Sequence, residues 1–148
     1  MITTLKEAYE LVGKPTTDNS KMTATLCFNT DPELCNTGSE LRKIADSVCR
    51  FCYSMRLCNF RKNVKLSYRR NTELLISALD DMGYPRVAEI MSFIIGKKKQ
   101  TMGITKVRIK DGGDAVSELE FFMWVEVARR CRGQKFWCPT KEYGWFAF

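Results

Sequence analysis

The stretch ITKVRIKDGGD, residues 104–114, predicts how the chain folds. Its first seven residues alternate, with Thr, Val and Ile at 105, 107 and 109 and a cation at 106, 108 and 110. This period of two predicts a strand with three cations on one face. Such a strand is either an exposed edge or the lining of an anion site. The turn DGGD ends in Asp114, which we expect to be the N-cap of the next helix.

The segments on either side of this strand predict an α/β fold. Strand patterns recur in MTATLCF and QKFWCPTK, and helical spacing of apolar residues occurs four times. The order is helix, strand, irregular segment, two helices, strand, helix, strand, which is typical of an α/β layer. We therefore expect a single domain over 1–148, with an open or partial barrel-like sheet, helices and an irregular cysteine-rich segment. The expected strands are 22–28, 104–110 and 134–141. The expected helices are 4–13, 63–82 and 115–130, together with one that has Pro85 in its first turn. The expected loops include 14–21 and 96–103.

Composition narrows the cellular setting. No apolar run approaches the roughly 20 residues that span a bilayer, so we expect no membrane association. The first 14 residues lack the apolar stretch of a signal peptide, which predicts a cytoplasmic protein. The chain has seven cysteines and no histidine. In a reducing cytoplasm, clustered cysteines favour metal binding or reactivity over disulfides.

Three cysteines crowd into VCRFCYSMRLC, residues 48–58. Cys49 and Cys52 form a C-x-x-C, a spacing that serves zinc, iron–sulfur clusters and redox dithiols equally. Cys35 lies upstream, and either Cys58 or Cys27 is a candidate fourth ligand. Without histidine, a zinc site would be all-cysteine or include a carboxylate, whereas three thiolates with an open position suit an iron–sulfur cluster. The alternative is that these cysteines are reduced and structural, as we expect for Cys131 and Cys138.

The net charge of +7 is concentrated around the cysteines. Residues 41–70 contain nine basic residues against the single acid Asp46. A positive field there would attract phosphate, a cofactor or an acidic protein surface, unless these charges form a solvated helix face. The tail KEYGWFAF, residues 141–148, is either a set of interface anchors or a strand packed on the core.

Several of these stretches together resemble the gene-product-88 family of bacteriophages. They are NSKM (19–22), CNTGSELRKIADSVCRFCYSMR (35–56), VRIKDGGD (107–114) and WVEVARRCRGQKFWCPTK (124–141). The family's recurring cysteines match Cys35, Cys49 and Cys52, and its pattern does not ask for Cys58 or Cys27. By analogy, this arrangement is similar to radical S-adenosylmethionine enzymes, in which three thiolates hold a [4Fe–4S] cluster and a glycine-rich strand end contacts the methionine part. The resemblance therefore implies an iron–sulfur or zinc centre, with S-adenosylmethionine as a possible ligand. The residues implied to face it are Arg108, Lys110, Gly112, Gly113 and Asp114.

Two departures from the family pattern shape the functional expectation. Family members tend to carry His-Asp-Ser-Gly-Asp where this chain has the residues 110–114, and they usually continue beyond the last predicted strand. Both departures imply a shortened relative that has given up catalysis. We expect a small phage accessory protein in the host cytoplasm that binds a host protein or ribonucleoprotein complex, for example as a CRISPR inhibitor. The alternatives are a radical-S-adenosylmethionine-like or other iron–sulfur enzyme, and a nucleic-acid-binding protein.

Overall fold

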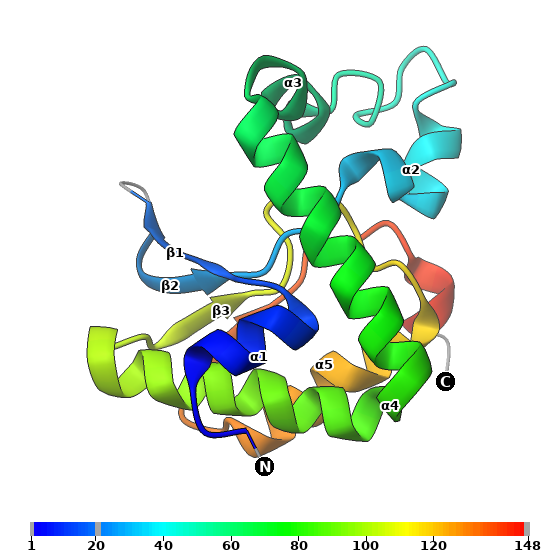
Figure 1. Ribbon diagram of the computed structural model, residues 1–148. Coiled ribbons are helices and arrows are strands. Elements are labelled where there is room, and N and C mark those ends of the chain that lie inside the picture. Colours follow the sequence, from blue (N-terminus) through cyan, green and yellow to red (C-terminus); the bar gives the residue numbers. More distant parts are fainter. Residues whose placement is uncertain (1, 20–21, 147–148) are drawn as a thin grey trace.

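The computed structural model describes residues 2–19 and 22–146, and it contains a four-stranded open sheet flanked by helices (Figure 1). The strands are β1 (Thr16–Asn19), β2 (Met22–Cys27), β3 (Lys106–Arg108) and β4 (Lys135–Trp137), in the spatial order β1-β2-β3-β4. β1 pairs with β2 antiparallel, whereas β2, β3 and β4 are parallel. The predicted α/β fold is confirmed, with the open form of the sheet.

β3 lies inside the sheet, hydrogen-bonded to β2 on one side and to β4 on the other. β3 is therefore not an exposed edge strand, which was one of the two predictions made from its three cations. Val107 is fully buried between Leu26 and Phe136 in the parallel register. Two buried residues, Ile109 and Lys110, extend the strand direction into the DGGD turn.

Three helices build most of the core against this sheet. They are α1 (Leu5–Val12), α4 (Lys62–Met102) and α5 (Glu118–Arg130), and α4 contacts both of the others. α1 begins with a capping box in which Thr4 and Glu7 satisfy each other's backbone N–H groups. α4 consists of two helical halves joined at Gly83, whose φ of 73° is not helical, and Pro85 lies in the first turn of the second half as predicted. The shared core residues include Leu26, Phe28, Leu75, Val87, Ile94, Val107, Met123 and Trp124.

Several boundaries differ from the sequence-based prediction. Residues 96–102 continue α4 instead of forming a loop, because their lysines and glutamine are good helix formers on an exposed turn. Part of the expected loop 14–21 pairs with β2 as β1, while its residues Ser20 and Lys21 lie outside the described part. The expected strands at 104–110 and 134–141 shrink to three residues each.

The cysteine-rich segment is irregular, as predicted. The short helix η1 (Pro32–Leu34) and α2 (Asn36–Leu41) precede it, residues 42–52 form successive turns, and α3 (Tyr53–Phe60) follows. Figure 1 shows α3 and these turns at one end of the molecule, away from α1 and α5. In the described tail, Tyr143–Phe146 form the short helix η2 with Tyr143 exposed; Phe148 lies outside the described residues. Among the described helices, none has the length and apolar character needed to cross a membrane.

Candidate functional site

A pocket of about 340 Å³ lies where the cysteine-rich segment meets the end of β3. We call it the cysteine pocket. It brings together three of the four cysteines predicted as ligands and four of the five residues predicted to face a cofactor; Gly112 and Cys58 are not among its lining residues. The lining residues are Pro32, Cys35, Gly38, Arg42, Cys49, Cys52, Tyr53, Ser54, Arg108, Lys110, Asp111, Gly113, Asp114, Pro139, Thr140, Lys141 and Tyr143.

Local backbone structure positions the cysteines. Cys35 is the N-cap residue of α2, and Cys52 is the N-cap residue of α3, with no side-chain cap at either position. The Cys52 N–H donates to the Cys49 carbonyl oxygen at 3.2 Å, so the C-x-x-C is a tight turn. A helix N-terminus carries partial positive charge, which stabilises a nearby thiolate. α3 presents such an end to the cysteine pocket.

Burial dominates the acid–base behaviour of Cys35. It raises the pKa of the Cys35 thiol to about 12, with a further increase from the Asp114 carboxylate and an opposing effect of the Arg42 guanidinium. A negative charge on Cys52 also raises this pKa. Cys35 is therefore a neutral thiol at pH 7 and becomes a thiolate only when a positive charge binds beside it.

The remaining two candidate ligands, Cys58 and Cys27, are buried within the protein at 3% and 5% exposure. Burial raises the pKa of both thiols, to about 11 for Cys27. In the part of the chain that the structure describes, no three Cys, Asp or Glu side chains are placed as a preformed metal-binding group. The donor chemistry of the pocket nevertheless suits a metal centre with thiolate ligands, so the metal site remains a prediction.

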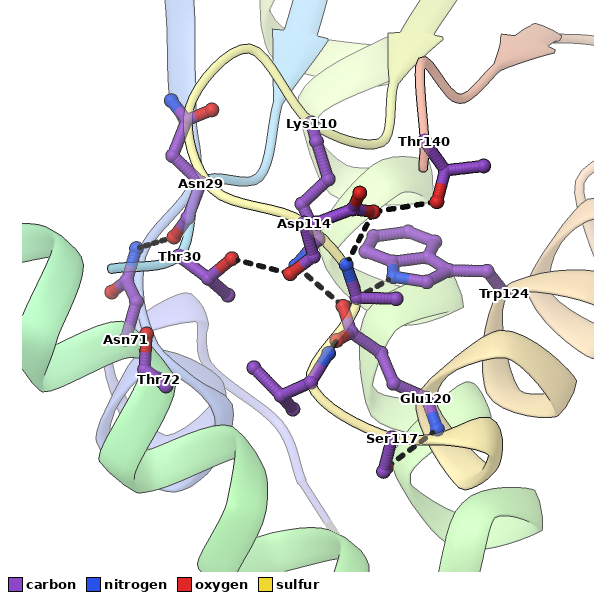
Figure 2. Close-up of polar contacts among 12 residues, drawn as sticks. Asn29, Thr30, Asn71, Thr72, Lys110, Asp114, Ser117, Glu120, Trp124 and Thr140 are labelled. Atoms are coloured by element: carbon purple, nitrogen blue, oxygen red, sulfur yellow. Dashed lines mark hydrogen bonds and ion pairs between the residues drawn. The ribbon is translucent and has the colours of Figure 1, made fainter. Parts of the chain in front are cut away.

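Asp114 holds the wall of the pocket together instead of capping a helix (Figure 2). Its carboxylate accepts hydrogen bonds from the Thr140 hydroxyl at 2.6 Å, the Lys141 N–H at 2.7 Å and the Ala115 N–H at 2.8 Å. The predicted N-cap role is wrong, because α5 starts three residues later and Ser117 accepts from the Glu120 N–H. Asp114 thus fixes the DGGD turn to the segment that follows β4.

Lys110 forms a buried ion pair beneath the same wall (Figure 2). Its ammonium nitrogen lies 2.6 Å from the Glu120 carboxylate, and the two side chains are 1% and 0% exposed. Glu120 also accepts from the Trp124 indole N–H at 3.0 Å and from the Val116 N–H at 2.8 Å. The anionic partner of Lys110 is therefore Glu120, a side chain of the protein itself. Beyond the ion pair, the Lys110 ammonium makes no hydrogen bond to the described residues.

The two glycines of the turn are required by close packing. Gly113 has a φ of +79°, and a Cβ there would lie 2.5 Å from the Thr30 carbonyl oxygen. A Cβ on Gly112 would lie 2.5 Å from the Ser54 hydroxyl and 2.7 Å from the Tyr68 ring. The Asn29 side chain accepts from the Asp111 and Gly112 N–H groups at 2.8 and 2.9 Å, which fixes the turn against the end of β2.

Arg108 lines the pocket, and an ion pair within the protein neutralises part of its charge. It forms an ion pair with Asp111 at 2.8 Å and donates to the Lys110 carbonyl oxygen at 3.0 Å, while its side chain remains 26% exposed. Tyr53, at the start of α3, donates to the Asp111 carbonyl oxygen at 3.0 Å. These contacts connect the β3 end directly to the C-x-x-C segment.

A model of the family described as gene product 88 matches residues 6–148, nearly the whole chain. The chain belongs to the gene product 88 family of bacteriophage proteins. No curated protein and no solved structure gives a significant match.

Three residues of this gene product 88 member matter at the site and were missed by the sequence-based prediction. Asn29 holds the DGGD turn, Glu142 accepts the Thr37 N–H at the start of α2, and the Ser54 hydroxyl lines the pocket. Ser54 is 3% exposed, and its hydroxyl has no hydrogen-bond partner among the described residues. Asn29 and Glu142 bind partners more than 50 residues away in the sequence, and Ser54 matters because it is buried. The local sequence indicates neither property.

Lys110→Met should lower the free energy of unfolding by about 3–5 kcal/mol, because Glu120 would remain as an unpaired buried charge. The double variant Lys110→Met with Glu120→Gln should lose clearly less free energy of unfolding. The glutamine amide is neutral and keeps a hydrogen-bond acceptor at this position. Lys106→Met, at an exposed position of β3, serves as the control. Urea denaturation followed by circular dichroism measures all three. Equal losses for the single and double variants would contradict the buried pair.

Gly113→Ala should destabilise the protein by about 2 kcal/mol or more, because it combines a positive φ with overlap on the Thr30 backbone. Gly96→Ala is the matched control, since a Cβ there meets nothing within 4 Å and replaces glycine inside α4. The control should gain about 0.5–1 kcal/mol in thermal or urea denaturation. A Gly113→Ala variant as stable as the control would show that the turn does not need glycine.

Proposed function

We propose that this gene product 88 member is an iron–sulfur protein whose centre is held by Cys35, Cys49 and Cys52 and whose pocket binds a small anionic or zwitterionic ligand. The supporting observation is that the three cysteines which match the family pattern line one pocket together with the end of β3. Cys35 and the C-x-x-C come from separate segments of the chain.

The number of thiols in the pocket favours an iron–sulfur cluster over zinc. A closed all-cysteine zinc site needs four thiolates, and the pocket lining contains three. Two carboxylates line the pocket and could replace the fourth thiolate, and both are already engaged. Asp111 pairs with Arg108, and Asp114 accepts hydrogen bonds from Thr140 and the Lys141 N–H. A [4Fe–4S] cluster held by three thiolates keeps one iron available for an external ligand and supplies electron transfer to it. Arg42, which donates to the Pro32 carbonyl oxygen at 3.0 Å, would contribute positive charge beside Cys35.

The free polar groups of the pocket favour a ligand with a carboxylate. Ser54 is buried at the pocket lining, and its hydroxyl has no hydrogen-bond partner among the described residues. Buried donors are ordinarily satisfied, so a bound acceptor would account for this hydroxyl. Arg108 adds a partly exposed guanidinium. S-adenosylmethionine carries a carboxylate of this kind, and in this proposal Ser54 and Arg108 bind that carboxylate.

Anaerobic purification should yield a brown protein that contains iron and sulfide, and Cys35→Ala, Cys49→Ala or Cys52→Ala should each lose the iron. Cys58→Ala is the control and should keep it, because Cys58 does not line the pocket. Elemental analysis and the charge-transfer absorbance measure the outcome. Because burial raises the pKa of Cys35 to about 12, a proton competes with the metal there, and iron retention should fall as the pH is lowered. A colourless protein, or zinc in place of iron, would reject the proposal.

A second candidate function is the inhibition of a host defence complex, such as a CRISPR complex, through an acidic surface of one of its proteins. The observation that favours it is the exposure of Val48 (73%) and Phe51 (72%) on either side of Cys49 and Arg50. Large apolar side chains beside an exposed arginine are typical anchors of protein interfaces. Arg50 forms no ion pair within the described residues, so it is available to an acidic partner.

The second candidate predicts that expression of the protein restores transformation of a CRISPR-targeted plasmid in the host. Val48→Ser combined with Phe51→Ser should abolish this effect, because the variant lacks both exposed anchors while the iron content should stay unchanged. Leu119→Ser, which removes an exposed apolar side chain from α5, is the control. Unchanged plasmid loss in the presence of the wild-type protein would reject this candidate.

A further inference from the structure

The cations between residues 47 and 72 fall into two groups. This stretch holds seven cations and no acid. Lys65 and Arg69 are paired with acids near η1: Lys65 lies 2.6 Å from Glu33, and Arg69 lies 2.7 Å from Glu33 and 2.8 Å from Asp31. The others are exposed and have no ion pair within the described part of the chain. They are Arg50, Arg56, Arg61, Lys62 and Arg70.

Two of the unpaired cations lie on one face of α4. Lys62, Leu66 and Arg70 are spaced four residues apart and are all exposed, with Leu66 at 66%. Tyr68 and Leu75 are buried on the opposite side of the helix. This outward face extends about 12 Å along the helix axis from Lys62 to Arg70.

The same face continues into a cleft of about 530 Å³ between α1 and α4. α4 contributes Leu66, Ser67, Arg70 and Asn71, and the α1 side contributes Lys6, Tyr9, Glu10 and Lys14. The cleft is therefore lined by three cations and one acid, Glu10, which is 3.9 Å from Lys6. The Asn71 side chain accepts from the Lys14 N–H at 2.9 Å and donates to its carbonyl oxygen at 3.0 Å, which holds the two walls together. The Tyr9 hydroxyl is buried and has no hydrogen-bond partner among the described residues.

An exposed aromatic ring lies at the end of α3, two residues before the first residue of this face in the chain. Phe60 is 83% exposed, the highest value among the described large hydrophobic residues, and it directly precedes Arg61 and Lys62. An aromatic face beside phosphate-binding cations is the combination with which proteins bind single-stranded nucleic acid.

We propose that the α4 face from Lys62 to Arg70, the adjoining α1–α4 cleft and Phe60 bind single-stranded nucleic acid. Lys62, Arg70 and the cleft lysines contact successive phosphates, the Tyr9 hydroxyl donates to a phosphate oxygen, and Phe60 stacks on a base. Among the described residues exposed on this α4 face, Leu66 is the only large apolar side chain between these cations, whereas a protein-docking face presents several apolar anchors together. This binding does not depend on the cysteine pocket, because none of these residues lines it.

The test is fluorescence anisotropy with a labelled oligo-dT of about 12 nucleotides, a length within the range of compact single-strand sites. Wild-type protein should bind it with an affinity that falls as salt is raised. Lys62→Gln combined with Arg70→Gln should weaken binding about tenfold at low salt and reduce the salt slope by about 1.4, since each lost phosphate contact removes about 0.7. Phe60→Ala should weaken binding about fivefold or more without changing the slope.

The control is Lys106→Gln combined with Lys135→Gln, which removes two exposed cations from adjacent positions of β3 and β4. It should change the affinity less than about twofold. Ultraviolet crosslinking of the wild-type protein, read by mass spectrometry, should place the strand at Phe60 and Tyr9, which tests the site without any variant. The proposal is overturned if wild-type protein does not bind, if the control loses as much affinity as the α4 variant, or if crosslinks fall elsewhere. It is also overturned if polyglutamate displaces the strand as well as unlabelled oligo-dT does, which would indicate an acidic protein ligand.

Discussion

The buried ion pair between Lys110 and Glu120 is the constraint on which the rest of the structure depends. A charge pair with almost no solvent exposure is stable only when its geometry is close and its remaining polar atoms are satisfied. The Trp124 indole N–H and the Val116 N–H donate hydrogen bonds to the remaining acceptor positions of the Glu120 carboxylate. The end of β3 is therefore fixed to the first turn of α5. Together with the hydrogen bonds of Asp114, this pair sets the position of the pocket wall that faces the cysteines.

The cysteine pocket is assembled from parts that have little regular structure. Its cysteines lie in turns and at helix starts, where they add little to the core, while the end of β3, the DGGD turn and the segment after β4 form the opposite wall. Tyr53 and Asn29 connect the two halves by bonding the backbone around Asp111. A wall fixed by hydrogen bonds opposite the segment that carries the three thiols suits the proposed iron–sulfur centre, because such a wall can orient a ligand beside it.

The basic stretch that surrounds the cysteines serves two purposes in this fold. Lys65 and Arg69 pair with acids of the η1 region and thereby anchor the segment that carries Cys35. Arg70 lies about 100° around the helix from Arg69 and lines the α1–α4 cleft, whereas Lys62 lies almost in line with Arg69 and has no ion pair within the described residues. One helix therefore carries both the cations that anchor the Cys35 segment and those of the proposed nucleic-acid site.

The sequence by itself determined the fold class, the irregular cysteine segment and the division of α4 near Pro85. It also grouped Cys35, Cys49 and Cys52, which line one pocket. These features could be predicted because periodicity, glycine, proline and motif spacing are local signals. Tertiary structure alone decided that Lys110 forms an ion pair with Glu120 and that Asp114 accepts a hydrogen bond from Thr140 instead of capping α5. It also decided which cations are paired. A side chain's partner across the core depends on packing between distant segments, and alternation along a strand specifies a face without specifying what covers it.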